Sequence, residues 1–280
     1  MKPVIALAAS LICVSAALSA PVHAHPVADD PATAHFLANE AVLIEAGETK
    51  ILFDPLFTNS YNTYPLIPAE MKAAMMAGEA PFDGVDTVFV SHVHGDHFDA
   101  EEMNAYLARH GEVIVVAPHQ ARLEMQRAAG WSDAFDARLR IMPFVSQAQA
   151  LSLADGAIEV SAVHIPHAGG PGRAHIQNMA YRVTLNDAAT VMHLGDATPD
   201  MPAYDSHADH FQARRTDRAF PPYWLISRWG GDTVRAQLNA DEITGIHVPI
   251  RLPIEVTASR EDFFTQPGET RGVHRHAGEE

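Results

Sequence analysis

Residues 86–97 read Asp-Thr-Val-Phe-Val-Ser-His-Val-His-Gly-Asp-His, so an apolar run leads directly into three histidines and an aspartate. The run 86–91 is typical of a strand that is buried on both faces. Side chains two residues apart in extended backbone point the same way, so His92 and His94 can hold one ion. A turn at Gly95 would aim Asp96 and His97 at a second point. The stretch therefore predicts metal ligands at a strand end rather than a surface loop that happens to be rich in histidine.

The residues after this cluster predict a helix. Asp99 followed three residues later by Glu102 is typical of a capping box at a helix N-terminus. We expect the helix to run from about residue 100 to residue 110, which places the ligand cluster on a strand-to-helix turn.

The preceding sequence predicts a hairpin and a less regular segment. Residues 41–46 and 50–54 are apolar runs on either side of Gly-Glu-Thr, and Pro55 stops the second strand just after Asp54. Residues 56–82 carry few charges, with a short helix expected at 68–77. We expect this segment to overhang the site.

Three later residues have the same placement at the end of an apolar run. His167 follows a strand expected at 158–165 and precedes a Gly-Gly turn, and Asp196 ends the run 189–195. His247 lies in the short run 243–248, after a helix expected at 232–238. Acids and histidines at several strand ends are how one edge of a sheet builds a site.

Other residues leave alternatives open. His164 and His175 flank His167 closely and either could replace it as a ligand. We interpret His193 as a core residue or a residue behind the ligands. The segment 221–224, Pro-Pro-Tyr-Trp, is either a substrate wall or packing beneath the site. Three further histidines are expected on the surface or in loops: His119, His207 and His210.

The composition excludes some classes of function. The chain has 280 residues with 19 Lys and Arg against 35 Asp and Glu, a formal net charge of −16. A polyanionic surface repels phosphate backbones, so nucleic-acid binding is not expected. The 17 histidines nearly equal the basic residues in number, which favours metal chemistry. Cys13 is the only cysteine, so the ligands must be histidine and carboxylate.

The N-terminal residues are interpreted as an export signal. Lys2 precedes an apolar run over 4–18, which is shorter than the roughly 20 residues of a membrane span. We expect residues 1–24 to be a signal peptide cleaved after Ala24, leaving no stable membrane anchor. The protein would then be periplasmic or secreted, with a single domain at 25–264 and a polar tail at 265–280.

The chain resembles the metallo-β-lactamase superfamily in the order of these parts. Asp54 after a strand is followed by His-x-His-x-Asp-His at 92–97, then by His167, by Asp196 in Leu-Gly-Asp, and by a late histidine, His247. The similarity is to the broad hydrolase branch of that family. It implies an α/β fold, a four-layer αβ/βα sandwich of two mixed sheets with helices outside and metals along one edge.

The resemblance also implies a site and an activity. His92, His94 and His167 would bind one metal ion, and Asp96, His97 and His247 the other, with Asp196 bridging and Asp54 behind the ligands. The expected cofactors are two divalent ions, zinc first, with manganese or iron as alternatives. A hydroxide bridging them would cleave an ester, lactone, amide or phosphodiester bond of a small-molecule substrate.

The sequence leaves two alternatives to hydrolysis open. One is a protein that uses the same metals to bind a small anion without turnover, and the other is an iron redox variant of the fold. Neither the substrate nor the oligomeric state follows from the sequence.

Overall fold

The predicted hairpin forms and belongs to the first of two sheets. The computed structural model describes residues 32–274, so the expected signal peptide at 1–24 lies outside the described residues. In the hairpin, β2 (Ala41–Ala46) pairs antiparallel with β3 (Thr49–Phe53), and Val42 lies opposite Phe53. A strand that was not predicted, β1 (Ala32–Ala38), pairs antiparallel with the outer side of β2.

Each sheet has seven strands, and both follow one pattern of three antiparallel and then three parallel pairings. The first sheet continues from β3 and is ordered β14 (Thr270–Val273), β1, β2, β3, β4 (Val85–Phe89), β5 (Ile114–Pro118), β6 (Leu139–Met142). The second is ordered β7 (Gln149–Leu153), β8 (Ile158–His164), β9 (Met179–Leu185), β10 (Ala189–His193), β11 (Thr216–Phe220), β12 (Ala240–Gly245), β13 (Asp262–Phe263).

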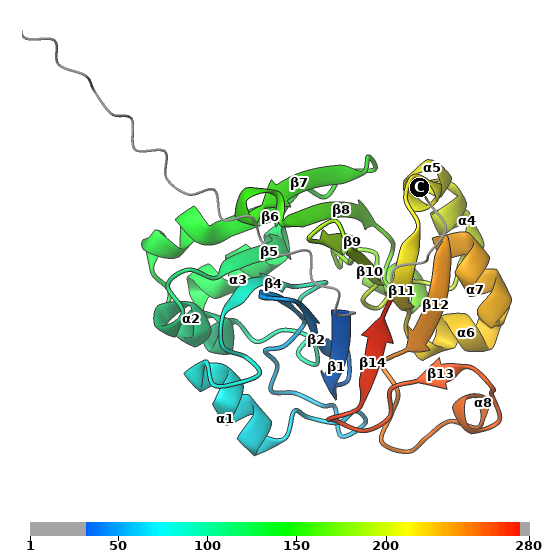
Figure 1. Ribbon diagram of the computed structural model, residues 1–280, viewed down its shortest axis with the longest axis horizontal. Helices are drawn as coiled ribbons and strands as arrows, with labels where there is room; N and C mark the ends of the chain where they lie inside the picture. Colours follow the sequence, from blue (N-terminus) through cyan, green and yellow to red (C-terminus); the bar gives the residue numbers. More distant parts are fainter. Residues whose placement is uncertain (1–31, 275–280) are drawn as a thin grey trace, which may run out of the picture.

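Helices cover the outer face of each sheet, which gives four layers (Figure 1). The first sheet is covered by α1 (Ala69–Ala77), α2 (Ala100–Arg109) and α3 (His119–Arg127). The second is covered by α4 (Met201–Asp205), α5 (Ala208–Gln212), α6 (Tyr223–Trp229), α7 (Gly231–Leu238) and α8 (Ile254–Thr257). Short 3₁₀ turns lie at η1 (Asp133–Arg138), η2 (Ala154–Gly156) and η3 (Gly170–Arg173). The predicted αβ/βα sandwich is thus confirmed.

The strand before the histidine cluster is buried on both faces, as predicted. Phe89 packs between the two sheets, where its ring centroid lies 5.3 Å from that of Tyr181. Val88 and Val90 point the other way, into the core beneath the helices. This alternation fixes which way the residues after β4 can point. The helix that follows begins where expected, because the Asp99 carboxylate accepts hydrogen bonds from two backbone N–H groups of its first turn.

The expectation of a polar tail at 265–280 is wrong for the residues of this segment that the structure describes. Residues 270–273 form β14, which pairs antiparallel with β1, and Val273 is buried in the core between the sheets. Arg271 forms an ion pair with Asp262 of β13, the edge strand of the second sheet. The segment therefore closes the edge of the first sheet.

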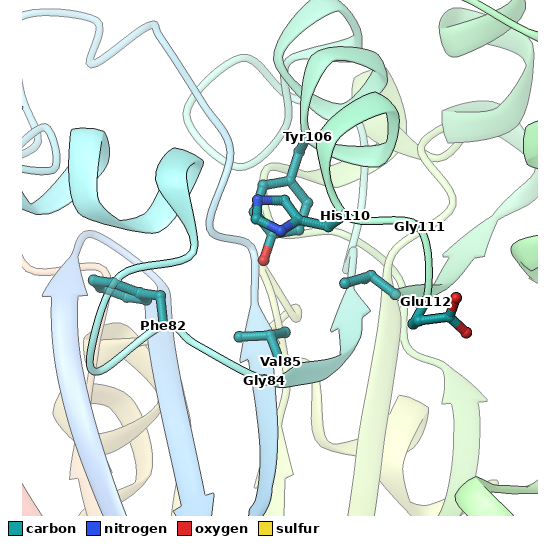
Figure 2. A pocket seen from close by; sticks show the side chains of 8 residues that line it. Phe82, Gly84, Val85, Tyr106, His110, Gly111 and Glu112 are labelled. Atoms are coloured by element: carbon teal, nitrogen blue, oxygen red, sulfur yellow. The ribbon is translucent and has the colours of Figure 1, made fainter.

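A separate cavity of about 200 Å³ lies at the N-terminal ends of β4 and β5, far along the strands from the histidine cluster. Figure 2 shows the rings of Tyr106 and His110 side by side above Phe82 and Val85. His110 donates a hydrogen bond from its Nε2 to the Met76 carbonyl, 3.2 Å away.

Among residues 32–274, no helix is long and apolar enough to cross a bilayer.

His210 corrects the expectation that it lies at the surface or in a loop. It is in α5 with 9% of its surface exposed, and its Nδ1 lies 3.1 Å from the Ser161 hydroxyl. Burial, aided by the positive charges of Arg182 and His207, lowers the pKa of His210 to about 3. Between pH about 3 and pH about 6.5 the imidazole is therefore mostly protonated in the unfolded chain and neutral in the folded protein.

This difference predicts acid sensitivity. The contribution of His210 to stability is complete above its unfolded pKa and falls as the pH drops from about 6.5 toward its folded pKa. Between pH 8 and pH 5 the loss is about 2 kcal/mol of unfolding free energy. We expect His210→Gln to remove that part of the loss, measured by urea unfolding at both pH values with chelator present. The exposed His119→Gln is the control, and an equal effect of both variants would contradict the account.

Candidate metal centre

The cluster after β4 meets residues from three other strand ends. His92, His94, Asp96 and His97 follow β4 of the first sheet. From the second sheet, His167 follows β8, Asp196 follows β10 and His247 follows β12. A backbone hydrogen bond of 2.9 Å from the Met179 N–H to the Ser91 carbonyl joins the two sheets beside them. All seven ligands proposed from the sequence therefore lie together at one edge of the sandwich.

The first group of ligand atoms converges around His94. Its Nδ1 lies 3.1 Å from His92 Nε2 and 2.9 Å from His167 Nε2. One Asp196 oxygen, Oδ2, lies 3.1 Å from His167 Nε2 and 3.9 Å from His92 Nε2. Ligand atoms about 2.0–2.2 Å from a tetrahedral ion are themselves roughly 3.3 Å apart. These four side chains have the spacing of ligands around one small ion.

The second group uses the other oxygen of the same carboxylate. Asp196 Oδ1 lies 3.0 Å from His247 Nε2 and 3.3 Å from His97 Nε2. The two imidazole nitrogens are 3.1 Å apart. Asp96 Oδ2 completes the group at 3.5 Å from His247 Nε2 and 3.8 Å from His97 Nε2. Asp196 thus faces one group with each oxygen, as a bridging carboxylate would.

The donor set and its electrostatics fit two divalent ions. Two carboxylates supply hard oxygen ligands and five imidazoles supply borderline nitrogen ligands, a combination that zinc, manganese and iron accept. Burial lowers the pKa of His94 to about 4, so its imidazole is neutral and able to ligate at neutral pH. Burial opposes charge on His247 too, but Asp196 and Asp96 raise its pKa to about 9. Metal binding at His247 therefore has to release a proton.

Hydrogen bonds behind the ligands fix their rings. The Asp54 carboxylate accepts from His97 Nδ1 at 2.9 Å, and from the backbone N–H and hydroxyl of Ser91 at 2.7 and 2.5 Å. The Ser91 hydroxyl in turn accepts from His92 Nδ1 at 3.0 Å. His167 Nδ1 donates to the carbonyl of Ala168 at 2.5 Å. Asp54 therefore orients a ligand of each group, one directly and one through Ser91.

The structure selects His167 from the alternatives. A bridge between His167 and Ala197, and a 2.7 Å bond from the Ala168 N–H to the Asp196 carbonyl, hold the two loops together. His164 points elsewhere, its ring centroid 4.2 Å from that of Phe144, and His175 is exposed.

The packing around His193 and around the segment 221–224 shows where these residues lie relative to the site. His193 is a buried core residue, stacked on Phe53 at 4.8 Å and donating to the Glu40 carbonyl. In the segment 221–224, the Trp224 ring lies 5.0 Å from the His247 ring, and its Nε1 donates to the Ala197 carbonyl. Trp224 therefore packs beside a candidate ligand.

The sequence interpretation missed the turn between β1 and β2. Asn39 has a φ of 50° and donates from Nδ2 to the Asp96 carbonyl at 2.9 Å, and its own backbone carbonyl accepts from the His247 N–H at 3.0 Å. Glu40 is fully buried, with one oxygen 3.7 Å from His97 Nδ1 and 3.6 Å from His193 Nε2. Neither Glu40 oxygen has a hydrogen-bond partner among the described residues, and burial raises the pKa of this carboxyl. Asn-Glu between two apolar runs is a turn signal that could have drawn attention to the pair.

Tyr64, from the segment expected to overhang the site, was also missed. Its ring meets the His247 ring edge-on, with centroids 4.1 Å apart. Burial and the nearby carboxylates of Asp196 and Asp96 raise the pKa of Tyr64, so its hydroxyl keeps its proton and can donate a hydrogen bond. One half-buried phenol therefore borders the second ligand group.

The chain matches one family model in sequence and several solved structures in fold. A family model described as a beta-lactamase superfamily domain matches residues 33–221. No curated protein matches the chain in sequence. Among solved structures, Igni18, a metallo hydrolase from Ignicoccus hospitalis, is similar with a TM-score of 0.58 and 16% identity, over 88% of this chain and 100% of that chain.

Two further solved structures are similar. An isothiocyanate hydrolase from Delia radicum gut bacteria matches with a TM-score of 0.56 and 14% identity, over 87% of this chain and 100% of that chain. The CmlA β-hydroxylase of Streptomyces venezuelae matches with a TM-score of 0.52 and 16% identity, over 87% of this chain and 54% of that chain. At these identities the likeness concerns the fold.

Proposed function

The chain belongs to the beta-lactamase superfamily and is a metal-dependent hydrolase, and we propose that it uses two divalent ions, zinc in the first place, to cleave an ester, lactone, amide or phosphodiester bond. One observation carries the proposal. The two oxygens of Asp196 face two separate groups of ligands, each within 3.1 Å of an imidazole nitrogen of its own group. A protein that binds a single ion has no use for the second group.

The residues of the site would have three roles: holding the ions, orienting the ligands and donating a hydrogen bond to the substrate. When bound, a pair of divalent ions lowers the pKa of water and polarises the bond to be cleaved. His92, His94 and His167 would hold one ion, Asp96, His97 and His247 the other, and Asp196 both. Asp54 holds the ring of His97 in place, and the Tyr64 hydroxyl can donate a hydrogen bond to an oxygen that gains negative charge.

Export is part of the same proposal and rests on the sequence alone. The apolar run at 4–18 and the small residue Ala24 support cleavage of a signal peptide before His25. N-terminal sequencing of protein recovered from the periplasm or medium would then give His25 as the first residue. Intact Met1 on soluble cytoplasmic protein would contradict export.

The proposed function is tested by measuring metals and turnover on the same preparation. Protein purified without added metal is analysed by inductively coupled plasma mass spectrometry, then assayed on ester, lactone, amide and phosphodiester substrates. We expect two ions per chain, mainly zinc, and hydrolysis of at least one class. Tight binding of a small anion without turnover would favour the non-catalytic alternative. Bound iron together with oxygen-dependent chemistry would favour the redox variant. This outcome is worth testing because the CmlA β-hydroxylase, an enzyme of a different reaction class, is similar in fold.

Asp54→Asn tests the role of the hydrogen bonds behind the ligands. The amide retains the shape of the carboxylate but can no longer accept from His97 Nδ1 and both Ser91 donors with the same charge. Losses of this kind cost about 10–100-fold in metal affinity or activity. We expect kcat to fall, or the zinc dissociation constant to rise, by about this factor, with an unchanged circular dichroism spectrum.

Asp99→Asn is the matched control, because asparagine also caps helices and Asp99 caps α2 outside the site. Full activity and full zinc affinity of Asp54→Asn would show that the ligand rings do not depend on this carboxylate.

A further inference from the structure

Exposed apolar side chains gather at one border of the metal centre. Within residues 32–274, seven large hydrophobic side chains are exposed, and five of them lie in two short segments. Ile254 and Ile250 are the most open, with 75% and 67% of their surface exposed. We call the five the apolar rim: Tyr61, Leu66, Ile250, Leu252 and Ile254.

The two segments of the rim lie side by side. The Ile250 N–H donates a 2.9 Å hydrogen bond to the Thr63 carbonyl, which joins the loop before α8 to the loop after β3. The first segment is tied to the ligand cluster as well, because the Asn59 N–H donates to the Gly95 carbonyl at 3.1 Å. The two loops that carry the rim are therefore joined, one from each half of the chain.

The rim continues into the candidate site. Tyr64 lies within the first segment, and its ring meets that of the ligand His247. His247 is itself only three residues before Ile250. A molecule whose reacting bond lies at the ligands can thus extend an attached chain over the rim.

Two other occupants fit the surface less well. A stable protein interface uses about 20–30 residues on each side, far more than two short loops supply. An anionic membrane surface would be repelled by a chain with a net charge of −16. Polyanionic substrates are disfavoured for the same reason.

We propose that the apolar rim binds an alkyl or aryl group of the substrate, so that the protein hydrolyses substrates that carry an extended apolar chain. This inference rests on the proposed hydrolase function and narrows it. Each methylene that leaves water on binding should favour the reaction by about two- to fourfold, with the lower value for a surface open on one side.

The test is a homologous series. Initial rates are measured with 4-nitrophenyl esters from acetate to dodecanoate, and binding of butanoate to decanoate is followed by tryptophan fluorescence in the metal-loaded protein. We expect kcat/KM to rise about twofold or more per methylene up to the octanoate ester, and the carboxylate dissociation constants to fall in parallel.

A double variant and a matched control locate the effect. Ile250→Ser with Ile254→Ser should reduce the gain to less than about 1.5-fold per methylene in both series, at unchanged metal content. Phe144→Ser with Val145→Ser replaces the other two exposed hydrophobic residues, in the loop between β6 and β7, and should leave the slope as in the wild type. Both pairs are exposed, so neither should unfold the protein.

The possible outcomes distinguish a failure of the rim proposal from a failure of the proposed hydrolase function. Hydrolysis with no dependence on chain length would overturn the rim proposal and leave the hydrolase intact. Absence of hydrolysis across the series would count against the function, while the carboxylate binding series would still decide the rim. A dimer in sedimentation, or binding to phosphatidylcholine vesicles, that the Ile250 and Ile254 variant abolishes would overturn the proposal in favour of a second copy or a membrane.

Discussion

Asp196→Ala is expected to leave no more than one tightly bound metal ion per chain and to lower kcat/KM for any hydrolysed substrate by more than about 100-fold. The loss should exceed the 10–100-fold typical of residues behind the ligands, because Asp196 supplies an oxygen to both groups. Metal content after dialysis against zinc and a full kinetic analysis measure the two effects.

Asp200→Ala is the control for this change. Asp200 lies four residues further along, is exposed, and makes no capping hydrogen bond to α4 with its side chain. It should keep both ions and full activity. Two firmly held ions in the Asp196→Ala protein would exclude the bridging carboxylate.

Gly195→Ala is expected to destabilise the fold and prevent the ligand groups from assembling. Gly195 has a φ of +55°, and a Cβ at this position would overlap the Asn178 side-chain oxygen and lie 2.7 Å from Ser91 Cβ. The left-handed backbone costs an alanine about 1–2 kcal/mol, and overpacking adds about 1–3 kcal/mol. We therefore expect a loss of about 2–5 kcal/mol in urea unfolding of the metal-free protein, together with reduced metal content.

Gly84→Ala separates backbone strain from close packing. Gly84 has a similar φ of +69°, but a Cβ there would meet nothing within 4 Å. Its substitution should cost only the backbone part, about 1–2 kcal/mol, and leave the metals in place. Equal losses in the two variants would show that the approach of Gly195 to Ser91 is not required.

Local patterns in the sequence predicted the parts of this fold that local physics decides. The apolar residues on both faces of β4, the hairpin β2–β3 and the helix capped by Asp99 all depend on residues close together in the chain. The strand-end placement of His92, Asp196 and His247 follows from the same runs, because strands end where the apolar pattern ends.

Long-range contacts decide what the sequence could not. β14 is only four residues long, and it is a strand because Val273 pairs with Ala32, at the other end of the described chain. The choice of His167 over His164 depends on the bridge from its loop to Ala197. No role was predicted for Glu40, because only the packing of its turn against His97 and His193 buries it.

The shared strand pattern of the two sheets has a consequence for assembly. The first ligand group takes His92 and His94 from the loop after β4, and His167 and Asp196 from the second sheet. The other group repeats this division, with Asp96 and His97 against His247 and Asp196. Each ion would then be held by two side chains from the half of the chain that carries the first ligand cluster and by two from the half that forms the second sheet. Either half alone would offer an ion only half of its ligands, so we expect metal to bind after the halves have docked and then to oppose their separation.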